Sequence, residues 1–146
     1  MGLSWEELLR LAVRMEESGR DFYRTLAAGA KDPDTARIFG MMAEEEEDHA
    51  AVFRRGLPGE GGPLPEEAER YLETLLSGLS SRIPPEIEHP GQALALAVEM
   101  EKDSILFYTE LAAAVRDERA RRILDGILRA EKLHLVEMRE RFEDGS

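Results

Sequence analysis

The sequence predicts an all-α protein: a four-helix bundle made of two similar antiparallel helix pairs, joined by a long crossover that contains a short helix. Apolar residues recur at helical spacing through four long segments, and no segment shows the alternation typical of a strand. The residue pattern of the first half also returns in the second half. Glycines and prolines interrupt the chain at the places where these helices must end.

The first helix pair is expected over residues 3–56. Its first helix, Leu3–Gly29, contains many strong helix formers and few breakers. Asp32 can then act as N-cap before Pro33, a residue favoured at the first position of a helix. The second helix runs from about Pro33 to Arg55. Because the turn between the two helices is tight, they are expected to lie antiparallel.

The crossover is expected over residues 57–90. It begins with a stretch rich in glycine and proline, which ends the second helix. A short helix is predicted from Pro65 to about Leu79, with acidic residues in its first turn. His89 precedes another proline and is interpreted as a loop residue. A connection of this length can travel along the whole bundle.

The second helix pair is expected over residues 91–142, with helices at about Gly91–Val115 and Glu118–Phe142. It repeats the first pair at a constant offset of 85 residues, for example from Glu16 to Glu101. Without any gap, 17 of the 46 positions aligned between 9–54 and 94–139 are identical, whereas helices of biased composition share roughly a tenth by chance. We therefore interpret the chain as a duplicated two-helix unit within a single domain, residues 1–146.

Composition narrows the range of functions. The chain has 146 residues, of which 42% are hydrophobic, and this suits one globular domain with a real core. The absence of cysteine excludes disulfides, thiolate nucleophiles and iron–sulfur clusters held by this chain. A net charge of −12 argues against binding to nucleic acid or to an anionic membrane. With no apolar run near membrane-spanning length and no signal-peptide pattern, a cytoplasmic protein is expected.

Each of the four long helices carries one glutamate near the middle of its apolar stripe. On the second helix, steps of three and four lead from Phe39 and Met42 to Glu46, His49 and Phe53. Of the neighbouring acids, those at 44, 47 and 48 are expected to face solvent, and the one at 45 lies at the border. The complete set of stripe residues is Glu16, Glu46, Glu101 and Glu131, with His49 and His134 one turn after two of them.

Four carboxylates in an apolar core need compensation, because an unpaired buried charge is strongly unfavourable. Protons could supply it, or two divalent cations, whose four positive charges match the four carboxylates. Carboxylate together with imidazole suits iron or manganese, and zinc would also bind. Two plainer interpretations remain at this point: a structural bundle whose acids are at the surface, and a metal site with a structural role only.

These residues resemble the ferritin-like superfamily, and most closely its rubrerythrin branch. The resemblance covers nearly all of both helix pairs. It is carried by Met15-Glu16 with Phe22-Tyr23, Glu45-Glu46 with Asp48-His49, Met100-Glu101 with Phe107-Tyr108, and Ala130-Glu131 with His134. One Glu-x-x-His on a helix is a weak signal. Two of them, matched to two further glutamates at one constant offset, form the ligand pattern of di-iron carboxylate bundles.

The resemblance implies a role for each residue. Glu46 and Glu131 would bridge two metals, Glu16 and Glu101 would be terminal carboxylates, and His49 and His134 would each hold one metal. Tyr23 and Tyr108 would each hydrogen-bond a carboxylate ligand on the opposite helix, although packing alone also explains two tyrosines at these positions.

The function that the resemblance implies is a non-haem di-iron oxidoreductase, associated with oxidative stress, that reduces peroxide or dioxygen. It implies two iron ions as cofactor, with manganese or zinc possible, and a homodimer. Rubrerythrins usually carry a rubredoxin-like site held by four cysteines. This chain has none, so an external electron donor protein is expected.

A second departure concerns the position where rubrerythrins tend to carry an extra carboxylate. Ser104 stands there, with Asp103 expected to point away, and this weakens a peroxidase assignment. Gly19 and Ser104 are small, so a space large enough for dioxygen or peroxide is expected beside them. The alternatives are a ferroxidase or other iron storage or handling protein, and a metal-stabilised structural or sensor module.

Overall fold

The computed structural model describes residues 4–59, 66–82 and 90–142. These residues form five helices and no strand, which confirms the all-α prediction. The helices are α1 (Trp5–Gly29), α2 (Pro33–Arg55), α3 (Glu66–Arg82), α4 (Pro90–Ala114) and α5 (Glu118–Phe142). The four long helices match their predicted bounds to within two residues, and α3 ends three residues later than expected. The predicted helix start at Pro65 and the loop residue His89 lie outside the described residues.

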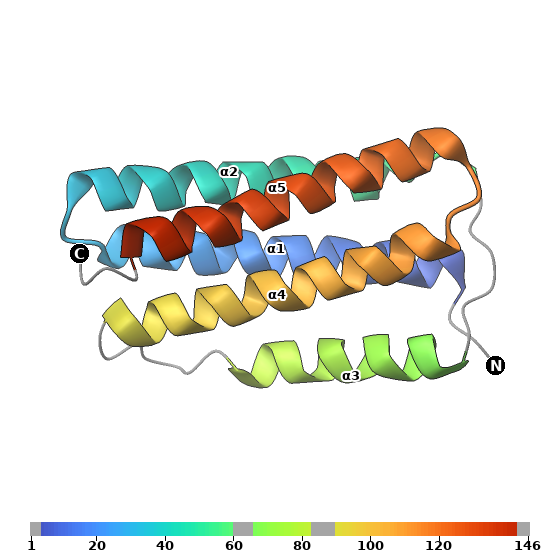
Figure 1. Ribbon diagram of the computed structural model, residues 1–146, viewed down its shortest axis with the longest axis horizontal. Coiled ribbons are helices and arrows are strands. Elements are labelled where there is room, and N and C mark those ends of the chain that lie inside the picture. The colour runs from blue at the N-terminus through green and yellow to red at the C-terminus, as the bar shows by residue number, and fades with distance from the viewer. Residues whose placement is uncertain (1–3, 60–65, 83–89, 143–146) are drawn as a thin grey trace.

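The four long helices form the bundle, and the short one lies along its side (Figure 1). Helix α1 packs antiparallel to α2 and α4 packs antiparallel to α5, while α1 also contacts α4. After α2 the chain runs back along the bundle as α3, so that α4 starts at the opposite end (Figure 1). Helix α3 packs against α4 and buries Leu72 completely. The crossover therefore returns the chain to the end of the bundle where α2 begins, so that α4 starts there (Figure 1), and α3 packs against α4.

Side chains at the helix starts satisfy backbone N–H groups that have no partner within the helix. The Ser4 hydroxyl accepts a hydrogen bond from the N–H of Glu7 at 3.1 Å. Asp32 accepts one from the N–H of Thr35 at 3.1 Å, as its predicted role as N-cap requires. Asp117 does the same for α5, accepting from the N–H of Ala120 at 3.1 Å. These caps determine where α1, α2 and α5 begin.

The apolar stripes predicted for the second and fourth long helices are buried. On α2 the exposed fractions of Phe39, Met42 and Phe53 are 6%, 4% and 2%. On α5 the corresponding stripe, Leu124, Ile127 and Met138, is equally buried. Within the ranges described, no helix combines the length and the apolar character needed to cross a membrane.

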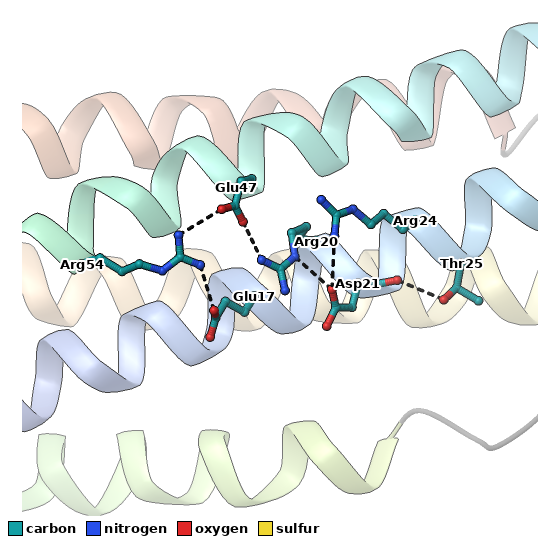
Figure 2. A network of polar contacts seen from close by, with 7 residues as sticks. All are labelled: Glu17, Arg20, Asp21, Arg24, Thr25, Glu47 and Arg54. Carbon is teal, nitrogen blue, oxygen red and sulfur yellow. Dashed lines mark hydrogen bonds and ion pairs between the residues drawn. The ribbon is translucent and has the colours of Figure 1, made fainter.

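An ion-pair network on the outer surface ties α1 to α2 (Figure 2). The Arg54 guanidinium contacts the carboxylates of Glu47 at 3.0 Å and Glu17 at 2.8 Å, and Arg20 contacts Glu47 at 2.6 Å. Hydrogen bonds from Arg54 and Arg20 lower the pKa of Glu47 to about 2. Glu47 points away from the core, as expected, and its side chain is 37% exposed. Arginines from both helices reach it there. Glu17 and Glu47 directly follow Glu16 and Glu46, which are buried.

Candidate metal centre

The six stripe residues meet in the middle of the bundle. All four glutamates are at most 3% exposed, His134 is 5% exposed and His49 is partly buried. In the part of the chain that the structure describes, their ligand atoms form two groups, with all atoms of a group within 4.8 Å of one another. The first group is Glu16, Glu46, His49 and Glu131, and the second is Glu46, Glu101, Glu131 and His134. Glu46 and Glu131 belong to both groups, as the bridging role requires.

Both histidines turn the same ring nitrogen, Nδ1, toward the carboxylates. Nδ1 of His49 lies 3.2 Å from Oε1 of Glu131 and 3.6 Å from Oε2 of Glu16. Nδ1 of His134 lies 3.3 Å from Oε1 of Glu46 and 3.6 Å from Oε1 of Glu101. The 85-residue repeat in the sequence is therefore a repeat in the geometry of the site.

The electrostatics of the cluster favour bound protons when no cation is present. Burial raises the pKa of Glu46 and of Glu101 well above the usual value, and the charge of Glu131 raises both further. Burial alone would lower the pKa of each histidine, but the surrounding carboxylates outweigh it. They raise the pKa to about 10 for His49 and to about 9 for His134. A cation that enters the cluster would take the place of these protons.

Unsatisfied polar atoms show that the residues suit a metal pair. Five buried side-chain atoms of the cluster have no hydrogen-bond partner among the described residues: Oε2 of Glu16, Oε1 of Glu46, Oε2 of Glu101, Oε2 of Glu131 and Nδ1 of His134. Buried polar atoms without partners are rare and unfavourable in proteins. Oxygen and imidazole donors that converge in this way match the ligands of iron, manganese or zinc.

Two tyrosines hold the terminal carboxylates, and each comes from the opposite helix pair. The Tyr23 hydroxyl on α1 donates a hydrogen bond to Oε1 of Glu101 on α4. The Tyr108 hydroxyl on α4 donates one to Oε1 of Glu16 on α1 at 2.5 Å. Burial, followed by the charge of the nearest glutamate, raises the pKa of both tyrosines. They therefore stay protonated and act as donors, the arrangement that the resemblance implied.

The carboxylate of Glu46 lies close to Gly19. A Cβ atom at this position would lie 3.1 Å from Oε2 of Glu46. Gly19 thus allows the close approach of the Glu46 carboxylate. The space expected beside it for an oxidant stays a prediction. Ser104, the other residue of that prediction, is partly exposed on α4.

Replacing Gly19 with alanine is expected to weaken metal binding about ten-fold or more while leaving the metal-free fold intact. The new methyl group must displace the Glu46 carboxylate by a few tenths of an ångström. Alanine also favours a helix by about 1 kcal/mol over glycine, so the helix itself should not suffer. Gly40→Ala is the matched control, because nothing lies within 4 Å of a Cβ there. Calorimetric metal titration of both variants tests this, and equal affinities would show that Glu46 tolerates the methyl group.

Two acidic residues near the centre have surroundings that the helical pattern did not indicate. Glu45, a border residue on α2, reaches Nε2 of His134 with its carboxylate. Asp103 belongs to neither ligand group, as expected, yet it is only 6% exposed. The helical pattern carried no signal for the Glu45 contact, since that contact depends on how α2 and α5 lie across from each other.

Comparisons with known proteins agree with this geometry. Residues 7–141 match the model of the rubrerythrin family. A crystal structure from Thermotoga maritima, named a ferritin-like diiron-carboxylate protein, is 24% identical with a TM-score of 0.74, over 99% of this chain and 98% of that one. A hypothetical protein from Pyrococcus furiosus is 25% identical with a TM-score of 0.70, over 97% of this chain and 89% of that one.

The search of curated proteins found no match. The solved structures show that the bundle has the ferritin-like fold. The family match spans nearly the whole chain and includes all six residues of the candidate metal centre. The chain therefore belongs to the rubrerythrin family.

Proposed function

We propose that the protein is a non-haem di-iron oxidoreductase that reduces peroxide or dioxygen. The observation that carries the proposal is the pair of four-residue ligand groups that share Glu46 and Glu131. Two cations held by these shared carboxylates would lie close together. They could then supply two electrons at one place, as the reduction of peroxide requires. Membership of the rubrerythrin family supports iron as the metal.

The residues of the chain would contribute binding, orientation and shielding. Bound iron would supply the redox electrons and the Lewis acidity. Glu46 and Glu131 would hold both ions, and each histidine would hold one through Nδ1. The Tyr23 and Tyr108 hydroxyls keep their protons and donate hydrogen bonds to the carboxylates of Glu101 and Glu16, which fixes the orientation of these carboxylates. Phe39 and Phe53 stack on these tyrosines and keep water away from them.

A separate electron donor is part of the proposal, because this sequence has no cysteine with which to hold an iron–sulfur relay. We include an external donor protein, a homodimeric assembly and a cytoplasmic location in the proposal. The absence of cysteine supports the first, and the resemblance to rubrerythrins supports the second.

The direct test is to load metal-free protein with Fe(II) without oxygen and to follow the absorbance after rapid mixing with peroxide or with dioxygen. Two irons per chain and a fast reaction with peroxide are the expected result. A fast reaction with dioxygen alone would favour a ferroxidase. Two bound irons that react with neither oxidant would point to a structural or sensing site, and no binding would overturn the proposal.

Ferroxidase activity coupled to iron handling is the second candidate. A net charge of −12 favours attraction of Fe(II) to the surface. Storage by this chain alone would require a hollow assembly. Size-exclusion chromatography distinguishes the two functions, because a dimer is too small to enclose an iron store.

Replacing Tyr23 with phenylalanine is expected to preserve the fold and to slow the reaction of the iron-loaded protein about ten-fold. The ring still fills its place against Phe39, but Glu101 loses the hydroxyl that orients it. Tyr71→Phe is the matched control, because Tyr71 is 40% exposed on α3. Rates from rapid mixing decide the question, and unchanged rates and spectra would reduce Tyr23 to a packing residue.

A further inference from the structure

The imidazole of His134 is held from both sides. Its Nε2 hydrogen-bonds the carboxylate of Glu45, which reaches in from the rim of α2 with about half of its side chain exposed. Its Nδ1 is buried, has no hydrogen-bond partner among the described residues and faces Glu46 and Glu101. A carboxylate that accepts the Nε2 hydrogen fixes the tautomer in which the Nδ1 lone pair points into the centre.

The other histidine lacks such a partner. In the repeat, the position equivalent to Glu45 is 130, and Ala130 stands there. An alanine offers no acceptor, and no described residue hydrogen-bonds Nε2 of His49, whose ring is 14% exposed. The duplicated centre, symmetric in its six ligands, is therefore asymmetric in the residues that support its two histidines.

We propose that Glu45 is a positioning residue for His134 and that it makes the two metal positions unequal. The position formed by Glu101 and His134 then binds a divalent cation more tightly and fills first. The position formed by Glu16 and His49 fills second. The inference rests on the metal centre of the proposed function, but it does not depend on any reaction with peroxide or dioxygen.

Two physical effects of Glu45 strengthen cation binding at the position formed by Glu101 and His134. The carboxylate restricts rotation of the His134 ring, so less conformational freedom is lost when the metal binds. The charge of the acceptor also makes the imidazole a better electron donor to a cation at Nδ1. Removing an outer hydrogen-bond partner of a metal-ligating histidine typically weakens metal binding about 10- to 100-fold. We expect a difference of the same size between the two positions.

The test is a titration of metal-free protein with Co(II), followed by calorimetry and by the visible absorption of the bound ion. Wild-type protein is expected to show two binding steps that differ at least about ten-fold in affinity. Glu45→Ala should weaken the tighter step about 10- to 100-fold and leave the other unchanged, so that the two steps merge. Glu45→Gln keeps an oxygen that can accept the Nε2 hydrogen, and an intermediate loss is expected.

Two controls separate positioning from a general effect of charge. Glu44→Ala removes the same charge from the exposed neighbour, and both affinities should stay within about two-fold of wild type. In a His134→Ala background, Glu45→Ala should have no further effect, whereas in a His49→Ala background it should keep its full effect. Such a double-mutant cycle shows whether Glu45 acts through His134.

The inference is overturned if Glu45→Ala leaves both Co(II) affinities unchanged. It is also overturned if Glu45→Ala weakens Co(II) binding as much in the His134→Ala background as in wild-type protein. Failure of the proposed metal centre would look different, because wild-type protein itself would then bind no Co(II). If wild-type protein binds two Co(II) ions with equal affinity, the proposed function still stands. The inference that the two metal positions differ in affinity is then contradicted.

Discussion

Replacing Glu46 with alanine is expected to abolish metal binding at both positions of the centre. The Glu46 carboxylate belongs to both groups of ligand atoms, so each position would keep only three donors. The loss should exceed the roughly 10- to 100-fold that follows removal of an outer hydrogen-bond partner. Glu131→Ala should behave in the same way, because Glu131 is shared equally.

Glu16→Ala is the matched control, since Glu16 belongs to one group only. After loading and desalting, we expect two metals per chain in wild type, one in Glu16→Ala and none in Glu46→Ala. Far-ultraviolet circular dichroism should show the same helical content for all three proteins. A Glu46→Ala protein that keeps two metals would contradict the bridging role.

The metal-free protein is expected to lose stability as the pH rises from about 6.5 to about 10. The pKa of His49 is raised from 6.5 to about 10 and that of His134 to about 9. Because both pKa values are raised in the folded state, the contribution of the two histidines to stability is fully present below pH 6.5. It is lost as the pH rises through their pKa values in the folded protein. Glu46 and Glu101, whose pKa values are also raised, act in the same direction above pH 4.5.

Metal should reverse this trend, because cations replace the protons of the cluster. Metal in excess, at about 100 times its dissociation constant, stabilises the fold by about 2.7 kcal/mol per site. Urea unfolding at pH 6 and pH 9, with and without Zn(II), measures both effects. The gain in unfolding free energy from metal should be larger at pH 9. If the metal-free protein is equally stable at both pH values, the buried cluster does not hold its protons as described.

Local patterns in the sequence were sufficient to predict the helices and the six residues that meet in the middle of the bundle. The N-cap at Asp32 and the breaks in the crossover determine the helix bounds without help from the rest of the fold. Glu46 and Glu131 could be placed in the core because each lies on an apolar stripe whose period is known. The duplication then related each ligand to its counterpart 85 residues away.

Features that depend on how helices pack could not be predicted in this way. On α1, Leu8 is only 2% exposed, whereas Leu9 is partly buried against the core and lines a groove with Val13 and Phe53. The contact of Glu45 with His134 and the ion pairs of Glu47 both join residues on different helices. The approach of the Glu46 carboxylate to Gly19 also joins two helices, and the absence of a side chain at Gly19 does not indicate which group lies beside it.

The crossed tyrosines make each helix pair dependent on the other. Tyr23 donates a hydrogen bond to a carboxylate of the second pair, and Tyr108 donates one to a carboxylate of the first. Each metal position likewise takes three ligands from its own pair and one from the other. A lone helix pair would have to find a second copy by diffusion to complete such a centre. Joining two pairs in one chain turns that encounter into an intramolecular one, so the centre can assemble at any protein concentration.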